Sequence, residues 1–189
     1  IALPWLRRGA LLTREDTRNL TMEEINRKLQ TTLTGIIEGY VKQLNPSLPA
    51  ILAAHVWVTG AKLGSERMMT IGQEHTLLLS SVANPALDYV ALGHIHRRQV
   101  LNEDPPVVYS GSMERVDFGE EGDEKGYYVV DITGEDGQRK TAYSFQPVRA
   151  RRFLTLDVKL GEDELDPTAA ILKAVELKKD ESKESIVRL

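Results

Sequence analysis

The clearest hydrophobic pattern in the chain lies between residues 21 and 44. Thr21 and Glu24 have the spacing of a capping box, in which a hydroxyl and a carboxylate bond the first free amides of a helix. Asn45 and Pro46 are typical of a helix end. We therefore predict one long amphipathic helix with a buried stripe. Its apolar residues recur at steps of three and four: Met22, Ile25, Leu29, Leu33, Ile36, Ile37, Tyr40, Val41 and Leu44.

Shorter apolar runs predict strands. Residues 51–58 lack polar alternation, which predicts a strand buried on both faces of a layered α/β sheet. Residues 134–137 predict a hairpin turn between the last two strands. The remaining runs of strand character are 1–6, 89–92, 107–109, 127–132 and 141–145.

A domain boundary is expected near residue 150, where a small basic cluster follows Pro147: Arg149, Arg151 and Arg152. Residues 1–150 would form one domain and residues 151–189 the beginning of a second. In the second part, the pattern predicts a strand over 153–160, a helix over 167–177, a charged turn over 178–183 and a further strand from Ile186. This order indicates the start of a small α+β module.

Composition narrows the function classes. The 189 residues are 41% hydrophobic and 28% charged, the balance of a globular chain, with a net charge of −4. Binding to nucleic acid would therefore use local basic patches or metal ions instead of a wholly basic surface. The chain has no cysteine, which excludes disulfides and thiolate chemistry. No apolar run approaches the roughly 18 residues of a membrane-spanning helix.

The histidines are the strongest candidates for chemistry. His55 lies in the apolar run 51–58, while His94 and His96 follow a strand and Gly93. An extended backbone would point the rings of His94 and His96 to the same side. Gly93 permits an unusual backbone angle or a close approach at that corner. Imidazole binds divalent transition metals, and ligands collect at strand ends in layered α/β proteins, so the three side chains indicate a metal site.

The alternative for these side chains is structural. A lone histidine in an apolar strand is more often a hydrogen-bonded core residue than a ligand, and this interpretation stays open for His55. His75, in a polar context, is predicted to be an ordinary surface residue.

A strand-borne histidine followed downstream by Gly-His-x-His resembles the calcineurin-like metallophosphoesterases. The chain resembles most specifically the SbcD-type nuclease subunits of bacterial SbcCD complexes. The segments that carry this resemblance occur in the family's order: Leu3-Pro4-Trp5, Ala53-Ala54-His55 with Gly60-Ala61, 88–96, the stretch 109–120 (YSGSMERVDFGE), and Lys125-Gly126.

The resemblance implies part of a four-layer α-β-β-α metallophosphoesterase sandwich, followed by the start of a capping domain. It implies two divalent metal ions, with Mn²⁺ expected, where His55 and His94 bind one ion and His96 the other. Three family motifs, Asp-x-His, Gly-Asp-x-x-Asp and Gly-Asn-His-Asp, are absent from the sequence. We therefore expect the catalytic residues to lie in an N-terminal half outside this chain. The chain alone is expected to be inactive and to bind one ion weakly at most.

The resemblance also implies a function for the intact protein. It would cleave DNA phosphodiester bonds, as an exonuclease at double-strand ends and an endonuclease on single strands or hairpins. The implied partners are DNA, an SbcC-type ATPase and a second copy of the nuclease subunit, in the cytoplasm and without a membrane. Candidate contacts to DNA or phosphate are Ser112, Arg115, Arg97 and Arg98, although an Arg115–Asp117 pair that only shapes the loop is the favoured interpretation of that segment.

Two other functions stay open at this point. A metallophosphoesterase acting on a small phosphate ester would use the same histidines, but it would need neither the 109–120 stretch nor the appended module. A non-catalytic fragment or binding module would keep the fold without the chemistry.

Overall fold

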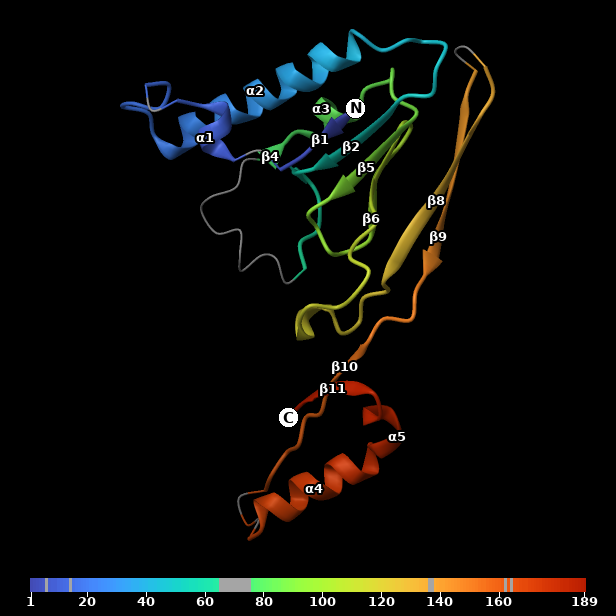
Figure 1. Ribbon diagram of the computed structural model, residues 1–189. Helices are drawn as coiled ribbons and strands as arrows, with labels where there is room; N and C mark the ends of the chain where they lie inside the picture. Colours follow the sequence, from blue (N-terminus) through green and yellow to red (C-terminus); the bar gives the residue numbers. More distant parts are fainter. Residues whose placement is uncertain (6, 14, 65–75, 136–137, 162, 164) are drawn as a thin grey trace.

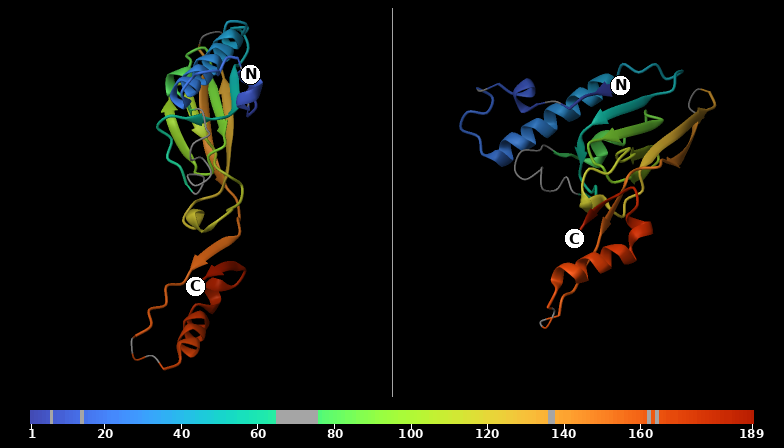
Figure 2. Two further views of the ribbon diagram at one scale, coloured as in Figure 1. Left: turned by 90° about the vertical axis from the view of Figure 1, so that its left-hand side faces the viewer. Right: turned by 60° about the horizontal axis from the view of Figure 1, so that its bottom comes forward.

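The computed structural model describes residues 1–5, 7–13, 15–64, 76–135, 138–161, 163 and 165–189. A main body holds a five-stranded sheet, and a small unit at the C-terminal end extends from it (Figures 1 and 2). The helices are α1 (Arg8–Leu11), α2 (Met22–Val41), α3 (Leu79–Val82), the 3₁₀ helix η2 (Phe118–Glu120), α4 (Pro167–Leu177) and α5 (Lys179–Ser182). The strands are β1 (Ala2–Leu3), β2 (Ile51–His55), β3 (Trp57–Val58), β4 (Thr76–Leu77), β5 (Tyr89–Gly93), β6 (Gln99–Glu103), β7 (Pro106–Tyr109), β8 (Gly126–Thr133), β9 (Lys140–Pro147), β10 (Arg152–Thr155) and β11 (Ser185–Arg188).

The main sheet has the strand order β1-β2-β5-β7-β6. Strands β1, β2, β5 and β7 are parallel, and β6 pairs antiparallel with β7 at the edge. The chain is thus mixed α/β, as the sequence predicted. Because neighbouring parallel strands end at the same edge, residues that follow β2 and β5 are brought together.

Helix α2 covers one face of this sheet. Its predicted capping box is confirmed: the Thr21 amide donates to Glu24 Oε2 at 2.7 Å, and the Glu24 amide donates to Thr21 Oγ1 at 3.2 Å. The predicted stripe is buried at Ile25, Leu29, Leu33 and Ile37, whereas Met22 and Tyr40, near the two helix ends, are half exposed. Leu33 and Ile37 share one hydrophobic core with Leu52, Val90 and other inward-facing strand residues.

The hairpin of β8 and β9 covers part of the opposite face. The two strands pair antiparallel from Gly126↔Pro147 to Thr133↔Lys140. The Tyr143 ring lies 6.1 Å from the Tyr89 ring of β5. The hydroxyl of Thr141 donates to the Asp88 carbonyl at 2.8 Å, which ties the hairpin to the start of β5.

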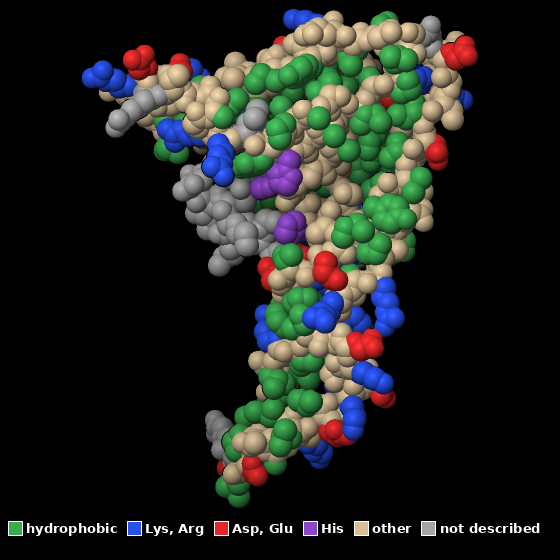
Figure 3. Space-filling model, viewed as in Figure 1, with side chains coloured by type: hydrophobic (Ala, Val, Ile, Leu, Met, Phe, Trp, Pro, Cys, Tyr) green, Lys and Arg blue, Asp and Glu red, His purple; other side chains and the backbone are tan. Residues whose placement is uncertain are grey.

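Strand β2 is not buried on both faces, so that prediction was wrong. Leu52 and Ala54 are buried under α2, whereas Ile51, Ala53 and His55 are exposed. The alternation arises because the hairpin contacts the β5 side of the sheet and leaves the outer face of β2 uncovered. Figure 3 shows hydrophobic side chains gathered over this face, with histidine side chains beside them.

The C-terminal unit is built on β10 and β11, which pair in parallel. Helix α4 matches the predicted range, and β11 confirms the strand predicted from Ile186. The strand predicted over 153–160 is shorter, because β10 ends at Thr155. The charged turn predicted over 178–183 contains a helical turn, α5, whose polar residues are all at least partly solvated.

Contacts with the 114–121 loop join this unit to the main body. The amide and hydroxyl of Thr155 donate to the Glu121 carboxylate at 3.0 and 2.7 Å. The rings of Phe118 and Phe153 meet edge to face, with centroids 4.9 Å apart. Within the described part of the chain, no helix is long and apolar enough to cross a membrane.

Candidate metal centre

The structure brings His55 and His94 together at the carboxyl ends of two neighbouring strands. His55 is the last residue of β2 and pairs with Gly93, the last residue of β5. The ring centroids of His55 and His94 lie 5.3 Å apart. The indole of Trp5 stacks on His94 at 4.9 Å and meets His55 edge to face at 6.1 Å. The Trp5 indole thus contacts and orients both imidazoles. The sequence pattern did not indicate this role for Trp5.

The backbone turns sharply where β5 ends. A Cβ at Gly93 would lie 3.1 Å from His55 Nδ1, so the absence of a side chain allows the predicted close approach. The next residue, His94, has a φ of 98°, in the left-handed region. The prediction of an extended backbone through His94 and His96 was therefore wrong, because the two-residue alternation of a strand does not continue through such a residue.

His96 has a different set of contacts. Its Nδ1 lies 2.8 Å from Oε1 of Glu120, a residue with no exposed surface. Lys125, whose side chain is also fully buried, lies 2.8 Å from Oε2 of the same carboxylate. The sequence analysis assigned no role to Glu120 or Lys125, because hydropathy places both in solvent. The available signal was their position in and just after the 109–120 stretch.

Tyr109 at the end of β7 supports the segment that follows His55. Its buried hydroxyl donates to the Val56 carbonyl at 2.7 Å and accepts from the Val58 amide at 3.0 Å. Burial raises the pKa of Tyr109, and the bond from the Val58 amide lowers it in part. The phenol therefore stays neutral, and its two hydrogen bonds connect β7 to the segment that contains β3.

The described residues supply only part of a metal-binding set. Among them, no group of three or more histidine, cysteine, aspartate or glutamate side chains is close enough to hold a metal ion. The paired imidazoles of His55 and His94 suit a transition metal as two of its ligands. His75 lies outside the described residues.

Ser112 and Arg115 make hydrogen bonds within the chain. The Ser112 hydroxyl donates to the Glu114 carbonyl at 2.7 Å and accepts from Lys125 Nζ at 3.0 Å. The Arg115 guanidinium donates to three carbonyl oxygens, those of Glu120, Asp123 and Arg151. Arg115 thus holds the loop in shape, but through carbonyl groups instead of the expected pair with Asp117. Asp117 instead accepts from the Gly119 amide and caps η2.

Arg97 and Arg98 lie beside the same loop. Arg98 donates to Glu124 Oε2 at 3.0 Å, and its guanidinium lies 4.2 Å from the centre of the Phe145 ring. Arg97 Nε lies 3.9 Å from Asp123 Oδ1, and half of its side chain remains exposed. Both arginines are close enough to the surface to meet an anionic partner.

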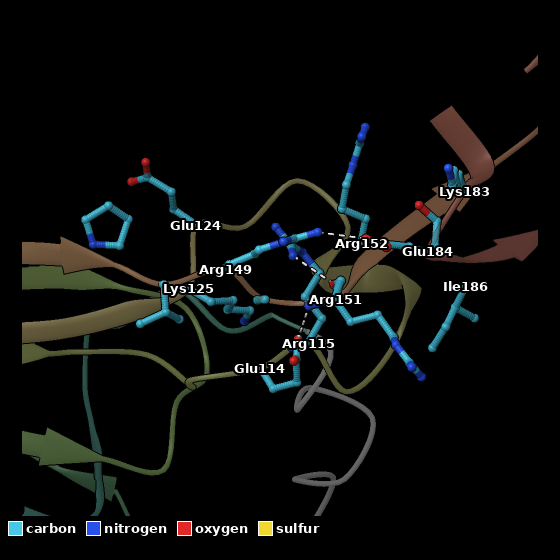
Figure 4. Close-up of a pocket in the computed structure, with 14 residues that line it drawn as sticks. Glu114, Arg115, Glu124, Lys125, Arg149, Arg151, Arg152, Lys183, Glu184 and Ile186 are labelled. Atoms are coloured by element: carbon cyan, nitrogen blue, oxygen red, sulfur yellow. Dashed lines mark hydrogen bonds and ion pairs between the residues drawn. The ribbon is translucent and has the colours of Figure 1, made fainter. Parts of the chain in front are cut away.

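A cavity of about 980 Å³ lies where the main body meets the C-terminal unit (Figure 4). Its lining draws residues from the 114–125 loop, from the basic cluster after Pro147 and from the start of β11. Arg149 pairs with Glu184 across it at 2.7 Å, while Arg151 and Arg152 are exposed. More basic than acidic side chains therefore line this cavity: Arg115, Lys125, Arg149, Arg151, Arg152 and Lys183 against Glu114, Glu124 and Glu184.

Comparison with known proteins gives two informative relatives, although no protein-family model matches the chain. The chain is 31% identical over 121 residues to the SbcD subunit of the nuclease SbcCD of Staphylococcus epidermidis, a match over 64% of this chain and 32% of that protein. It is 41% identical over 91 residues to the uncharacterized metallophosphoesterase YhaO of Bacillus subtilis, over 48% of this chain and 21% of that protein. The chain thus matches about a third or less of the length of these relatives.

The chain is thus similar to an SbcD nuclease subunit and to a metallophosphoesterase. Within that class it is SbcD-like, and it resembles the C-terminal portion of such proteins.

Proposed function

We propose that this chain forms part of a nuclease subunit that hydrolyses DNA phosphodiester bonds at a two-metal centre. The observation that carries the proposal is the pairing of the His55 and His94 rings at the carboxyl edge of the sheet in an SbcD-like sequence. Residues 1–150 would belong to the metallophosphoesterase domain and residues 151–189 to the beginning of a capping domain. The hairpin and main sheet would be parts of a four-layer sandwich.

In this proposal, His55 and His94 hold one metal ion and His96 contributes to the other. Manganese is the expected metal, and a bound pair of such cations would supply Lewis-acid stabilisation of the charge that develops on the phosphate. Trp5 and Gly93 fix the positions of the first two imidazoles. The bridging carboxylate and the remaining ligands would come from outside these 189 residues, so we expect the chain alone to be inactive.

Basic side chains near the centre would position the DNA backbone. Arg97 and Arg98 lie close in sequence to His96 and remain partly exposed, and Arg151 and Arg152 line the cavity at the junction. Phosphate contacts of this kind fix the register of a nucleic acid and make its affinity depend on salt. Ser112 and Arg115 would act mainly by shaping the loop between these two surfaces.

The relative's name also suggests the assembly. We propose that the complete protein works with an SbcC-type ATPase and as a pair of nuclease subunits in the cytoplasm. Copurification of the full-length gene product with that ATPase, and its mass in solution, test these two points separately.

A nuclease assay tests the proposed activity. The full-length gene product and this chain are compared on end-labelled linear plasmid, on a DNA hairpin and on p-nitrophenyl phosphate, with and without Mn²⁺. We expect Mn²⁺-dependent cleavage of both DNA substrates by the full-length protein and none by this chain.

Substitutions connect that activity to the site. His55→Ala and His94→Ala in the full-length protein should each reduce cleavage at least tenfold, whereas Glu23→Gln, at an exposed position on α2, should leave it unchanged. Hydrolysis of the small ester without cleavage of DNA would instead favour a small-substrate phosphoesterase. Metal-independent cleavage of DNA would contradict the proposal.

A further inference from the structure

A buried ion pair lies directly behind His96. The side chains of Glu120 and Lys125 have 0% exposure, and Glu120 Oε2 lies 2.8 Å from Lys125 Nζ. Removing two charges from water is costly, and their attraction offsets that cost only where further hydrogen bonds satisfy both groups. The partners of this pair therefore indicate what it does.

Lys125 Nζ also lies 3.7 Å from Asp123 Oδ2, but both members of the pair contact His96. Glu120 Oε1 lies 2.8 Å from His96 Nδ1, while Oε2 also accepts from the Val116 amide at 3.2 Å. Lys125 Nζ donates to the His96 carbonyl at 3.2 Å and to Ser112 Oγ at 3.0 Å. One ion pair thus holds both the ring and the backbone of the same histidine.

Gly111 completes the enclosure of that backbone. Its φ is 80°, and a Cβ there would stand 2.7 Å from the His96 carbonyl oxygen. The Ser112 amide also donates to this oxygen, at 3.1 Å. The His96 carbonyl therefore accepts two hydrogen bonds, which leaves the residue little freedom to rotate.

The protonation of the ring follows from the charges. The Lys125 ammonium group stabilises Glu120 as a carboxylate, and a carboxylate can only accept hydrogen bonds. The His96 Nδ1 that faces Glu120 Oε1 must therefore be the donor. In the neutral imidazole, the proton then lies on Nδ1 and the lone pair on Nε2, the form in which histidine binds a metal ion through Nε2.

We propose that Glu120, itself fixed by Lys125, is a positioning residue that holds the His96 imidazole in its Nδ1-protonated tautomer, the form that can bind a metal ion through Nε2. The tautomer is a property of this chain alone, and only its use for metal binding rests on the proposed function. A purely structural ion pair would stabilise the loop without setting the tautomer.

Long-range ¹H–¹⁵N correlation spectra of the metal-free chain, recorded where the histidines are neutral, distinguish these two roles. We expect the wild-type His96 ring in the Nδ1-protonated form. Two double variants remove the buried charges together, which limits the destabilisation that one unpaired charge would cause. Glu120→Gln with Lys125→Met puts an amide there, whose oxygen bonds the Val116 amide so that its NH₂ group faces Nδ1. Glu120→Leu with Lys125→Met removes the hydrogen-bonding group altogether.

Both double variants should lose the Nδ1-protonated form in favour of the Nε2-protonated form, because neither presents an acceptor to Nδ1. The His94 ring should stay unchanged in both, because the rings that pack against it are those of Trp5 and His55. An Nε2-protonated His96 in the wild type, or an unchanged tautomer in the leucine variant, would overturn the proposal.

Metal affinity of the full-length protein gives the second readout. Loss of an orienting carboxylate typically weakens metal binding about 10- to 100-fold. Both double variants should show such a loss for Mn²⁺. One outcome is that the tautomer shifts in the leucine variant while the wild-type full-length protein binds no Mn²⁺. In that case the proposed function fails, but the role of Glu120 in positioning His96 stands. If the wild type binds Mn²⁺ and the leucine variant binds it equally well, the Nδ1-protonated tautomer of His96 has no role in metal binding.

Discussion

Gly93 lies directly against the imidazole of His55, and a Cβ at Gly93 would stand 3.1 Å from Nδ1 of that ring. Because parallel pairing places the two residues opposite each other at the ends of β5 and β2, the glycine sets how closely His55 approaches the strand that carries His94. Backbone pairing thus determines the geometry of the two candidate ligands.

We predict that Gly93→Ala displaces the His55 ring and weakens divalent-metal binding by the full-length protein about tenfold. The effect on folding should be small, within about 1 kcal/mol, because His55 is exposed and its ring can move. Calorimetric titration with Mn²⁺ and urea unfolding measure the two effects. Gly122→Ala is the matched control, since a Cβ there meets nothing within 4 Å. Equal metal affinity of both variants would contradict the role assigned to Gly93.

The ion pair between Asp88 and Arg139 joins the main sheet to the hairpin. Arg139 Nε lies 2.9 Å from Asp88 Oδ1, and the Arg139 and Asp88 side chains are only 11% and 12% exposed. The Ala50 amide also donates to Asp88 Oδ2 at 2.7 Å. Asp88→Ala removes these bonds and leaves Arg139 unpaired, so it should lower the free energy of unfolding by about 2–4 kcal/mol.

Urea unfolding measures that loss, with Glu23→Ala as the control, because the Glu23–Arg27 pair is exposed and contributes little. Asp88→Asn keeps an acceptor for Ala50 and should have an intermediate effect. If Asp88→Ala destabilised the chain no more than Glu23→Ala, the ion pair would not be what attaches the hairpin to the sheet.

The link between Glu121 and Thr155 should depend on pH. Hydrogen bonds from the hydroxyl and then the amide of Thr155 lower the pKa of Glu121 below its ordinary value of 4.5, with a smaller contribution from Arg188. A lowered pKa in the folded state means that the link is fully stabilising above pH 4.5 and is lost as the pH falls through the lowered value.

Hydrogen exchange of the Thr155 amide, which donates to Glu121 Oε1, measures this loss. After correction for the intrinsic exchange rate, the protection of this amide should decrease as the pH is lowered from 4.5. Glu121→Gln should abolish that pH dependence. The Leu156 amide bonds the Arg188 carbonyl and provides an internal control. Parallel pH dependence at both amides would indicate general acid unfolding and contradict the specific link.

The features predicted correctly from sequence have local causes. The capping box at Thr21 and the apolar periodicity of α2 need only a few neighbouring residues, and both are confirmed. The hairpin strands β8 and β9 likewise follow from two apolar runs around a short connection. The pairing of His55 with Gly93 was within reach because the ends of neighbouring parallel strands share an edge.

The features that sequence missed depend on contacts between distant segments. Strand β6 has no continuous apolar run, and its position beside β7 at the sheet edge explains why it tolerates polar residues. The exposure of Ile51 follows from where the hairpin packs. The burial of Glu120 depends on Lys125 and His96, and no hydropathy pattern indicates that a charged residue will find such partners.

The central claim is that His55 and His94 are ligands from an SbcD-like metal centre of which this chain holds a part. Calorimetric titration of the 189-residue chain with Mn²⁺ tests it most directly. We predict weak binding of a single ion, lost in both His55→Ala and His94→Ala and retained in Glu23→Gln. Tight binding of two ions by this chain, or binding that neither histidine substitution changes, would contradict it.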